Sequence, residues 1–127
     1  MKHKDMLVGA SLFSILLLSF HFAQDALHAR PGTTGAGPFN IIAALMLAIM
    51  LAGTVLLAER RSGQILMLVV ALGALAMPFI HFTGKGDMNK HAGALFFVWC
   101  LIALGVSGTF SLLLLASELP RVWRHQL

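Results

Sequence analysis

Four long apolar runs, separated by short groups of charged residues, make up most of this chain. The runs cover residues 6–23, 39–58, 63–82 and 92–117. A helix needs about 20 residues to cross the roughly 30 Å of hydrocarbon in a bilayer, and each run comes close to that length. Because lipid offers the backbone no hydrogen-bond partners, each run should be a helix whose amides bond internally. The pattern therefore predicts an all-α integral membrane protein with four transmembrane helices.

The segments between the runs carry residues that favour turns. Residues 30–38 are rich in proline and glycine, residues 60–62 form a tight charged connection, and residues 83–90 form a second glycine-containing loop. We expect a single membrane domain over residues 1–127, folded as an up-down-up-down bundle. Its expected helices cover residues 6–29, 39–59, 63–82 and 91–118, and a tail follows at 119–127.

The distribution of lysine and arginine predicts how the bundle is oriented. The amino terminus, the second connection and the tail carry six of these residues, whereas the first and third connections carry three. Cytoplasmic segments are enriched in lysine and arginine, so we expect both termini in the cytoplasm. The layout resembles families of small bacterial membrane proteins in hydropathy alone, and we take the bacterial inner membrane as the host membrane. An alternative is that Lys2, Lys4 and the first run form a signal peptide, although a good small-residue cleavage site is lacking.

Composition excludes several other classes of protein. Hydrophobic residues make up 58% of the chain, charged residues make up 11%, and the mean hydropathy is +0.86. A soluble domain of this size would leave much of that apolar surface in water. The net charge of +4 reflects the cytoplasmic excess of basic residues, and without a run of five of them we expect no nucleic-acid partner. The single cysteine, Cys100, cannot form an internal disulfide, and we expect it to be a small packing residue.

Small residues recur at helical spacing in several runs. Ala44, Ala48 and Ala52 lie four residues apart in the second run, and Ala103, Ser107 and Ser111 do so in the fourth. Rows of this kind let membrane helices approach closely. We expect them to pack inside the bundle, and the alternative is a contact with other membrane subunits or with a second copy of the chain.

Four of the six histidines fall on the side of the membrane that this orientation makes external. They are His21, His28, His81 and His91, and Asp25 lies with them. His21, Asp25 and His28 are spaced i, i+4, i+7, so they share one face if the first helix continues to His28. His21 and His81 each lie about 4–5 Å inside the outer boundary. We therefore expect three helices to bring an imidazole to one layer of the bundle.

Several kinds of partner could satisfy the ring nitrogens of these histidines. The simplest are the Asp25 carboxylate and water at the headgroups. Alternatively, His21, Asp25, His28, His81 and His91 could supply part of a transition-metal shell. A further alternative is haem b, with His21 and His81 as ligands of its iron. The spacing matches no HExxH or CxxCH motif, so it does not choose between these partners.

The sequence predicts the architecture more sharply than the activity. No catalytic motif is present, and no Asp, Glu, Lys or Arg lies in the central part of any run, where ion-coupled carriers usually place one. We expect a non-enzymatic protein embedded in the lipid bilayer, acting as an accessory protein or as a subunit of a larger complex. The alternatives are a redox, metal-binding or haem-binding protein with an outer histidine cluster, and a small channel or carrier formed by oligomers.

Overall fold

The computed structural model describes the backbone of residues 2–28, 38–83 and 94–124, and the side chains of residues 2–26, 41–83 and 95–117. Within these ranges the chain forms four α-helices and no strand. The helices are α1 (His3–His28), α2 (Pro38–Leu56), α3 (Arg61–Thr83) and α4 (Ala94–Arg124). The predicted all-helical fold with four helices is confirmed.

The helix ends lie a few residues from those expected. α1 begins at His3, before residue 6, and its first turn carries Asp5, whose negative charge is favourable at a helix amino terminus. α2 ends at Leu56 in a turn in which the Arg60 amide donates to the Leu57 carbonyl over 2.8 Å. α4 continues past the expected end at residue 118 to Arg124. Charged residues mark where a membrane boundary lies, but they do not stop a helix.

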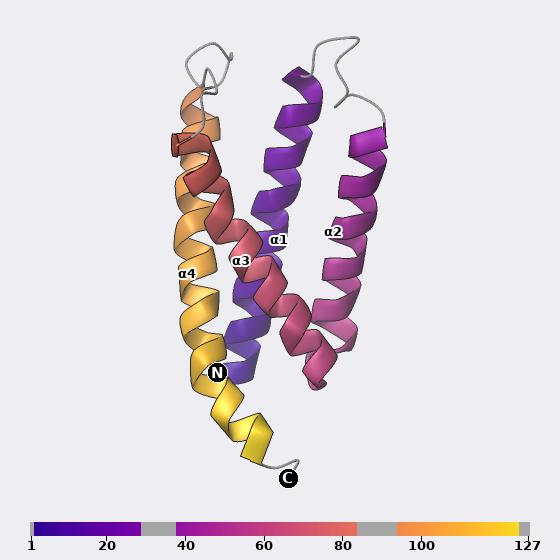
Figure 1. The fold of residues 1–127 in the computed structure, drawn as a ribbon, viewed down its shortest axis with the longest axis vertical. Helices are drawn as coiled ribbons and strands as arrows, with labels where there is room; N and C mark the ends of the chain where they lie inside the picture. Colours follow the sequence, from indigo (N-terminus) through magenta and orange to yellow (C-terminus); the bar gives the residue numbers. More distant parts are fainter. Residues whose placement is uncertain (1, 29–37, 84–93, 125–127) are drawn as a thin grey trace.

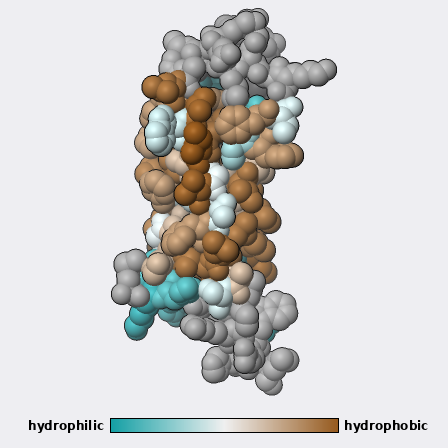
Figure 2. All heavy atoms as spheres, turned by 90° about the vertical axis from the view of Figure 1, so that its left-hand side faces the viewer, coloured by the Kyte–Doolittle hydropathy of each residue, from teal (hydrophilic) through white to brown (hydrophobic). Residues whose placement is uncertain are grey.

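Three of the helices are long and apolar enough to cross a membrane. These spans are His3–Ala26, Arg61–Thr83 and Leu95–Ser117, whereas the described apolar part of α2, Ile41–Leu56, is shorter. Figure 2 shows hydrophobic side chains over the middle of one face of the molecule, with hydrophilic ones gathered toward its lower end. Large apolar side chains such as Phe79 and Leu95 point outward. These features are compatible with a membrane protein.

The four helices run side by side, as Figure 1 shows. α1 and α3 each contact all three of the other helices. α1 starts and α4 ends at the lower end of the bundle in Figure 1, which we call the terminal end. The opposite end, where α1 and α3 finish, is called the far end.

The interior is built from apolar layers stacked between the helices. Near the terminal end, Leu7 and Met67 pack with Leu114 and Leu115. Toward the far end, a second cluster joins residues from α1, α3 and α4, and its members are Leu18, Ala74, Cys100 and Leu104. Cys100 is buried in this cluster, which confirms its predicted packing role.

α3 and α4 approach each other closely at Gly108. A Cβ atom on Gly108 would lie 2.8 Å from the Ala71 carbonyl oxygen and 2.9 Å from the Leu75 amide nitrogen. Both of these atoms belong to the backbone and cannot move away without displacing α3. Glycine at this position therefore sets the distance between the two helices.

A pair of serines links α1 to α4 in the interior. The Ser14 and Ser107 hydroxyl oxygens lie 2.9 Å apart, and each is also within hydrogen-bond distance of a carbonyl of its own helix, Ala10 for Ser14 (3.0 Å) and Leu104 for Ser107 (3.2 Å). Both side chains are buried. Each hydroxyl thus has a partner, as buried polar groups require in an apolar medium.

Charged residues lie at the terminal end. Lys4, in the first turn of α1, forms a salt bridge with Glu59 in the connection between α2 and α3. The hydrogen bond from Lys4, together with its positive charge, holds the pKa of the Glu59 carboxyl below its ordinary value. His3 contacts the Ser117 hydroxyl of α4 at the same end. These contacts place the start of α1 beside both the α2–α3 connection and α4.

Candidate metal centre

Two histidines and an aspartate meet at the far end of the bundle. His21 and Asp25 lie one turn apart on α1, and His81 lies in the last turn of α3. The imidazole rings of His21 and His81 are perpendicular, at 89°, with centroids 4.8 Å apart. Each of the three residues offers a ligand atom, and these atoms all lie within 4.8 Å of one another. We call this group the histidine cluster.

The contact within α1 is long for a hydrogen bond. The His21 Nε2 and Asp25 Oδ2 atoms are 3.4 Å apart, whereas N–H···O bonds usually measure about 2.7–3.2 Å. Two donors bound to one tetrahedral zinc ion at about 2.0–2.1 Å lie about 3.3 Å from each other. The spacing of these two atoms is thus close to that of two ligands of one ion, although separations within the whole cluster range up to 4.8 Å.

The tautomer of His81 is determined by its own helix. The Nδ1 atom lies 2.9 Å from the Met77 carbonyl oxygen, and a carbonyl can only accept, so Nδ1 carries the proton. In the neutral ring, Nε2 then has a free lone pair. Metal-binding histidines commonly donate their other nitrogen to a backbone carbonyl in this way.

His21 is the most deeply buried member of the cluster. Its side chain is 1% exposed, and its Nδ1 atom has no hydrogen-bond partner among the described residues. Leaving a buried polar atom unpaired costs about 1–3 kcal/mol. The buried hydroxyls of Ser11, Thr54 and Ser111 are also unpaired among the described residues, so His21 is distinguished by the donor atoms that lie beside it.

One side of the cluster is closed by an aromatic wall. The Phe97 ring of α4 lies with its centroid 5.3 Å from the centroids of both imidazoles, and Phe97 is buried. Phe22 lies next to His21 at 5.8 Å. Asp25, by contrast, is 44% exposed, and His81 is partly buried. The cluster is therefore shielded toward the bundle interior and accessible on the side of Asp25.

The structure brings together three of the five predicted metal-ligating residues, His21, Asp25 and His81. α1 does continue to His28, as the predicted row of ligands requires. The side chain of His28 and the whole of His91 lie outside the described residues. The roles predicted for those two histidines stay predictions.

Phe97 was not predicted to be part of the site. In the structure Phe97 lies on the buried face of α4 with Cys100, Leu101 and Leu104, but α4 is apolar on all sides, so the sequence carries no signal of which face turns inward. Phe97 lies one turn beyond Cys100 along this face, at the level of the histidines.

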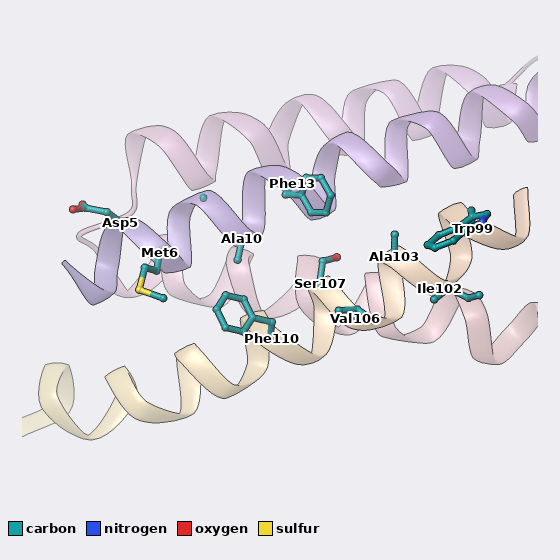
Figure 3. A pocket seen from close by; sticks show the side chains of 11 residues that line it. Asp5, Met6, Ala10, Phe13, Trp99, Ile102, Ala103, Val106, Ser107 and Phe110 are labelled. Atoms are coloured by element: carbon teal, nitrogen blue, oxygen red, sulfur yellow. The ribbon is translucent and has the colours of Figure 1, made fainter. Parts of the chain in front are cut away.

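A second concave feature lies between α1 and α4. This groove has a volume of about 540 Å³, and its walls include Phe13, Trp99 and Phe110 (Figure 3). Asp5 lies at one end, and the Ser107 hydroxyl also lines the groove. The groove is otherwise apolar and brings together no group of metal ligands. Among the described residues, the donors needed for metal binding gather in the histidine cluster.

Comparison with protein-family models, with curated proteins and with solved structures gives no match for this chain.

Proposed function

We propose that the chain is a four-span protein of the bacterial inner membrane that binds one divalent transition-metal ion at its outer end. In this proposal the helices alternate up and down, and both termini are cytoplasmic. Three long apolar helices support the membrane location. The lysine and arginine bias, with the start of α1 and the end of α4 at one end of the bundle, supports the orientation. The histidine cluster then faces the outer side.

The observation that carries the metal proposal is the convergence of three donor atoms from two helices. His21, His81 and Asp25 supply two imidazole nitrogens and a carboxylate oxygen within 4.8 Å of one another. Imidazole and carboxylate donors suit zinc(II) and other first-row ions such as iron(II). Binding of one ion by all three donors would bring atoms that now lie within 4.8 Å of one another to about 3.3 Å, so the side chains would close around the ion. The bound ion would also compensate the cost of holding these groups in an apolar layer.

Haem fits the cluster less well than a single ion. An iron bound at about 2 Å to one nitrogen of each ring would keep the ring centroids more than about 6 Å apart, with the haem plane between them. The His21 and His81 centroids are 4.8 Å apart, and Phe97 packs against both rings. We therefore propose a metal ion rather than haem.

The test is zinc titration of purified protein in lipid nanodiscs, after removal of metal with a chelator. We expect one zinc ion per chain. His21→Ala, His81→Ala and Asp25→Asn should each weaken zinc binding by about 100-fold or more, because loss of a supporting residue alone typically costs 10–100-fold.

A matched control exists in the same chain. His3→Ala removes a histidine at the terminal end, where its partner is Ser117, and should leave zinc affinity unchanged. Absence of stoichiometric zinc, or equal affinity in all the variants, would contradict the proposal. A Soret band in the purified protein would select haem instead. His28→Ala and His91→Ala test the roles predicted for those two residues.

A role as a subunit or accessory of a larger complex is compatible with metal binding and stays a prediction. Its support is that Ala44, Ala48 and Ala52 of α2 are exposed rather than packed inside the bundle. Co-purification of a fixed partner after mild solubilisation would support it, and a stable monomer would weaken it. Solute flux in liposomes would favour the channel or carrier alternative.

A further inference from the structure

We infer that the metal ion, once bound, keeps a coordination position open toward the outer solvent and exchanges small ligands there. This inference rests on the proposed metal-binding function and concerns what the bound ion can do. The ligands in question are water and small monovalent anions. The inference depends on how many donors the cluster supplies and on which side of it is accessible.

The number of donors is the first argument. The described residues supply three, one each from His21, Asp25 and His81. Structural zinc sites are usually closed by four cysteine or histidine ligands, whereas sites with two histidines and one carboxylate typically hold a water molecule as a further ligand. The same donor set with open positions is typical of non-haem iron(II) sites. The donors that the described residues supply are thus those of an open site, and a further donor from His28 or His91 would close it.

The direction of access is the second argument. Phe97 contacts both imidazole rings and closes the cluster on the side of α4. His21 is 1% exposed, so its ring does not contact the outer solvent. Asp25, at 44% exposed, marks the accessible side. A ligand from solvent would therefore reach the ion beside the carboxylate.

The two histidines and Asp25 would have different roles in holding the ion. His21 is buried and His81 donates to the Met77 carbonyl, so these two side chains have less room to move than Asp25, and they would fix the ion. Asp25, being exposed, is free to adjust as the ion changes its number of ligands. A site of this kind binds an external ligand without requiring the helices to move.

The experiment uses cobalt(II) in place of zinc, because its visible absorption reports the number and type of ligands. The wild-type protein in nanodiscs is loaded with one equivalent of cobalt(II) and titrated with azide and with thiocyanate. We expect the cobalt bands to shift and saturate with each anion. His21→Ala, loaded in the same way, should show no such response, and free cobalt(II) in empty nanodiscs provides the baseline.

The outcomes separate this inference from the function on which it rests. A cobalt spectrum that is present but unchanged by either anion would overturn the open position, since a fourth protein donor would then close the site. If the anion response appears only in His28→Ala or His91→Ala, that histidine is the closing ligand and the inference is equally wrong. The absence of any protein-bound cobalt spectrum would instead refute the metal centre itself, and the open position with it.

Discussion

Two polar contacts are buried on the inward face of α1, and their hydrogen bonding differs. The Ser14 and Ser107 hydroxyls both have partners, one across the helix interface and one within α4. Seven residues further along, His21 lies beside His81 and Asp25, but its Nδ1 atom is unpaired among the described residues and its Nε2 contact is long. A hydroxyl can turn back to its own helix carbonyl, whereas a ring cannot do so with both nitrogens. Three buried hydroxyls, those of Ser11, Thr54 and Ser111, are also unpaired among the described residues, so what distinguishes His21 is the convergence of other donor atoms beside it. We infer that the serine pair stabilises the bundle, while the histidine cluster has the donors to hold a further ligand.

The largest expected effect comes from a change at the close approach of α3 and α4, next to Ser107. Gly108→Leu would press a side chain against the backbone of α3 at Ala71 and Leu75. Such overpacking should cost about 3 kcal/mol or more, because backbone atoms cannot yield as side chains do. Unfolding by denaturant in detergent micelles would measure it. The control is Gly73→Leu, since a Cβ there has nothing within 4 Å. Equal losses in the two variants would contradict the close approach.

The next largest effect is the change in stability on replacing His21, which should have the opposite sign to the change on replacing either serine. His21→Leu removes a buried ring with an unpaired nitrogen, so metal-free protein should be as stable as wild type or more stable by about 1 kcal/mol. Added zinc should stabilise the wild type, because it binds only the folded state, but should not stabilise the variant. Thermal unfolding with and without zinc would measure both effects. A large loss of stability without metal would mean that His21 has a structural role like that of the serines.

A smaller effect is expected at the serine pair. Ser14→Ala and Ser107→Ala should each lower stability, and a double-mutant cycle should give a coupling of about 0.6 kcal/mol, the average for interhelical hydrogen bonds in a membrane protein. Zinc affinity should not change in either variant. A coupling near zero would show that the two hydroxyls do not depend on each other.

The smallest effect is expected at the terminal end, where the Lys4–Glu59 pair is exposed to solvent. The pKa of Glu59 is lowered in the folded protein, so the unfolded chain takes up this proton first as the pH falls. The contribution of the pair is thus fully present above the ordinary carboxyl value of 4.5 and is lost as the pH falls through the folded pKa. Comparing wild type with Glu59→Gln between neutral and acidic pH would measure it. High salt should reduce the difference, and a difference that grows with acidity would contradict the sign.

Much of the fold could be predicted from where the charges fall, because lipid leaves an apolar run of this length little choice but a helix. The pairing of His21 with Asp25 also followed from spacing within one helix. The perpendicular contact with His81 and the wall formed by Phe97 did not. A helix that is apolar on all sides gives no signal of which face turns toward its neighbours. The rotations of α3 and α4 are set instead by small residues such as Ala71 and Gly108, whose effect depends on a partner helix.

The length of α4 has a consequence for where the bundle sits in the bilayer. Its 31 residues extend about 46 Å, compared with roughly 30 Å of hydrocarbon. In a bilayer the helix must therefore tilt or extend beyond the hydrocarbon. Arg121 and Arg124 occur in that final stretch of sequence. Moving this stretch into the bilayer would bring two cations into hydrocarbon. The end of α4 would therefore fix the position of the bundle along the bilayer normal. In a thicker bilayer of lipids with longer tails, the far end would then lie deeper in the hydrocarbon. The proposed metal ion would exchange more slowly in such a membrane.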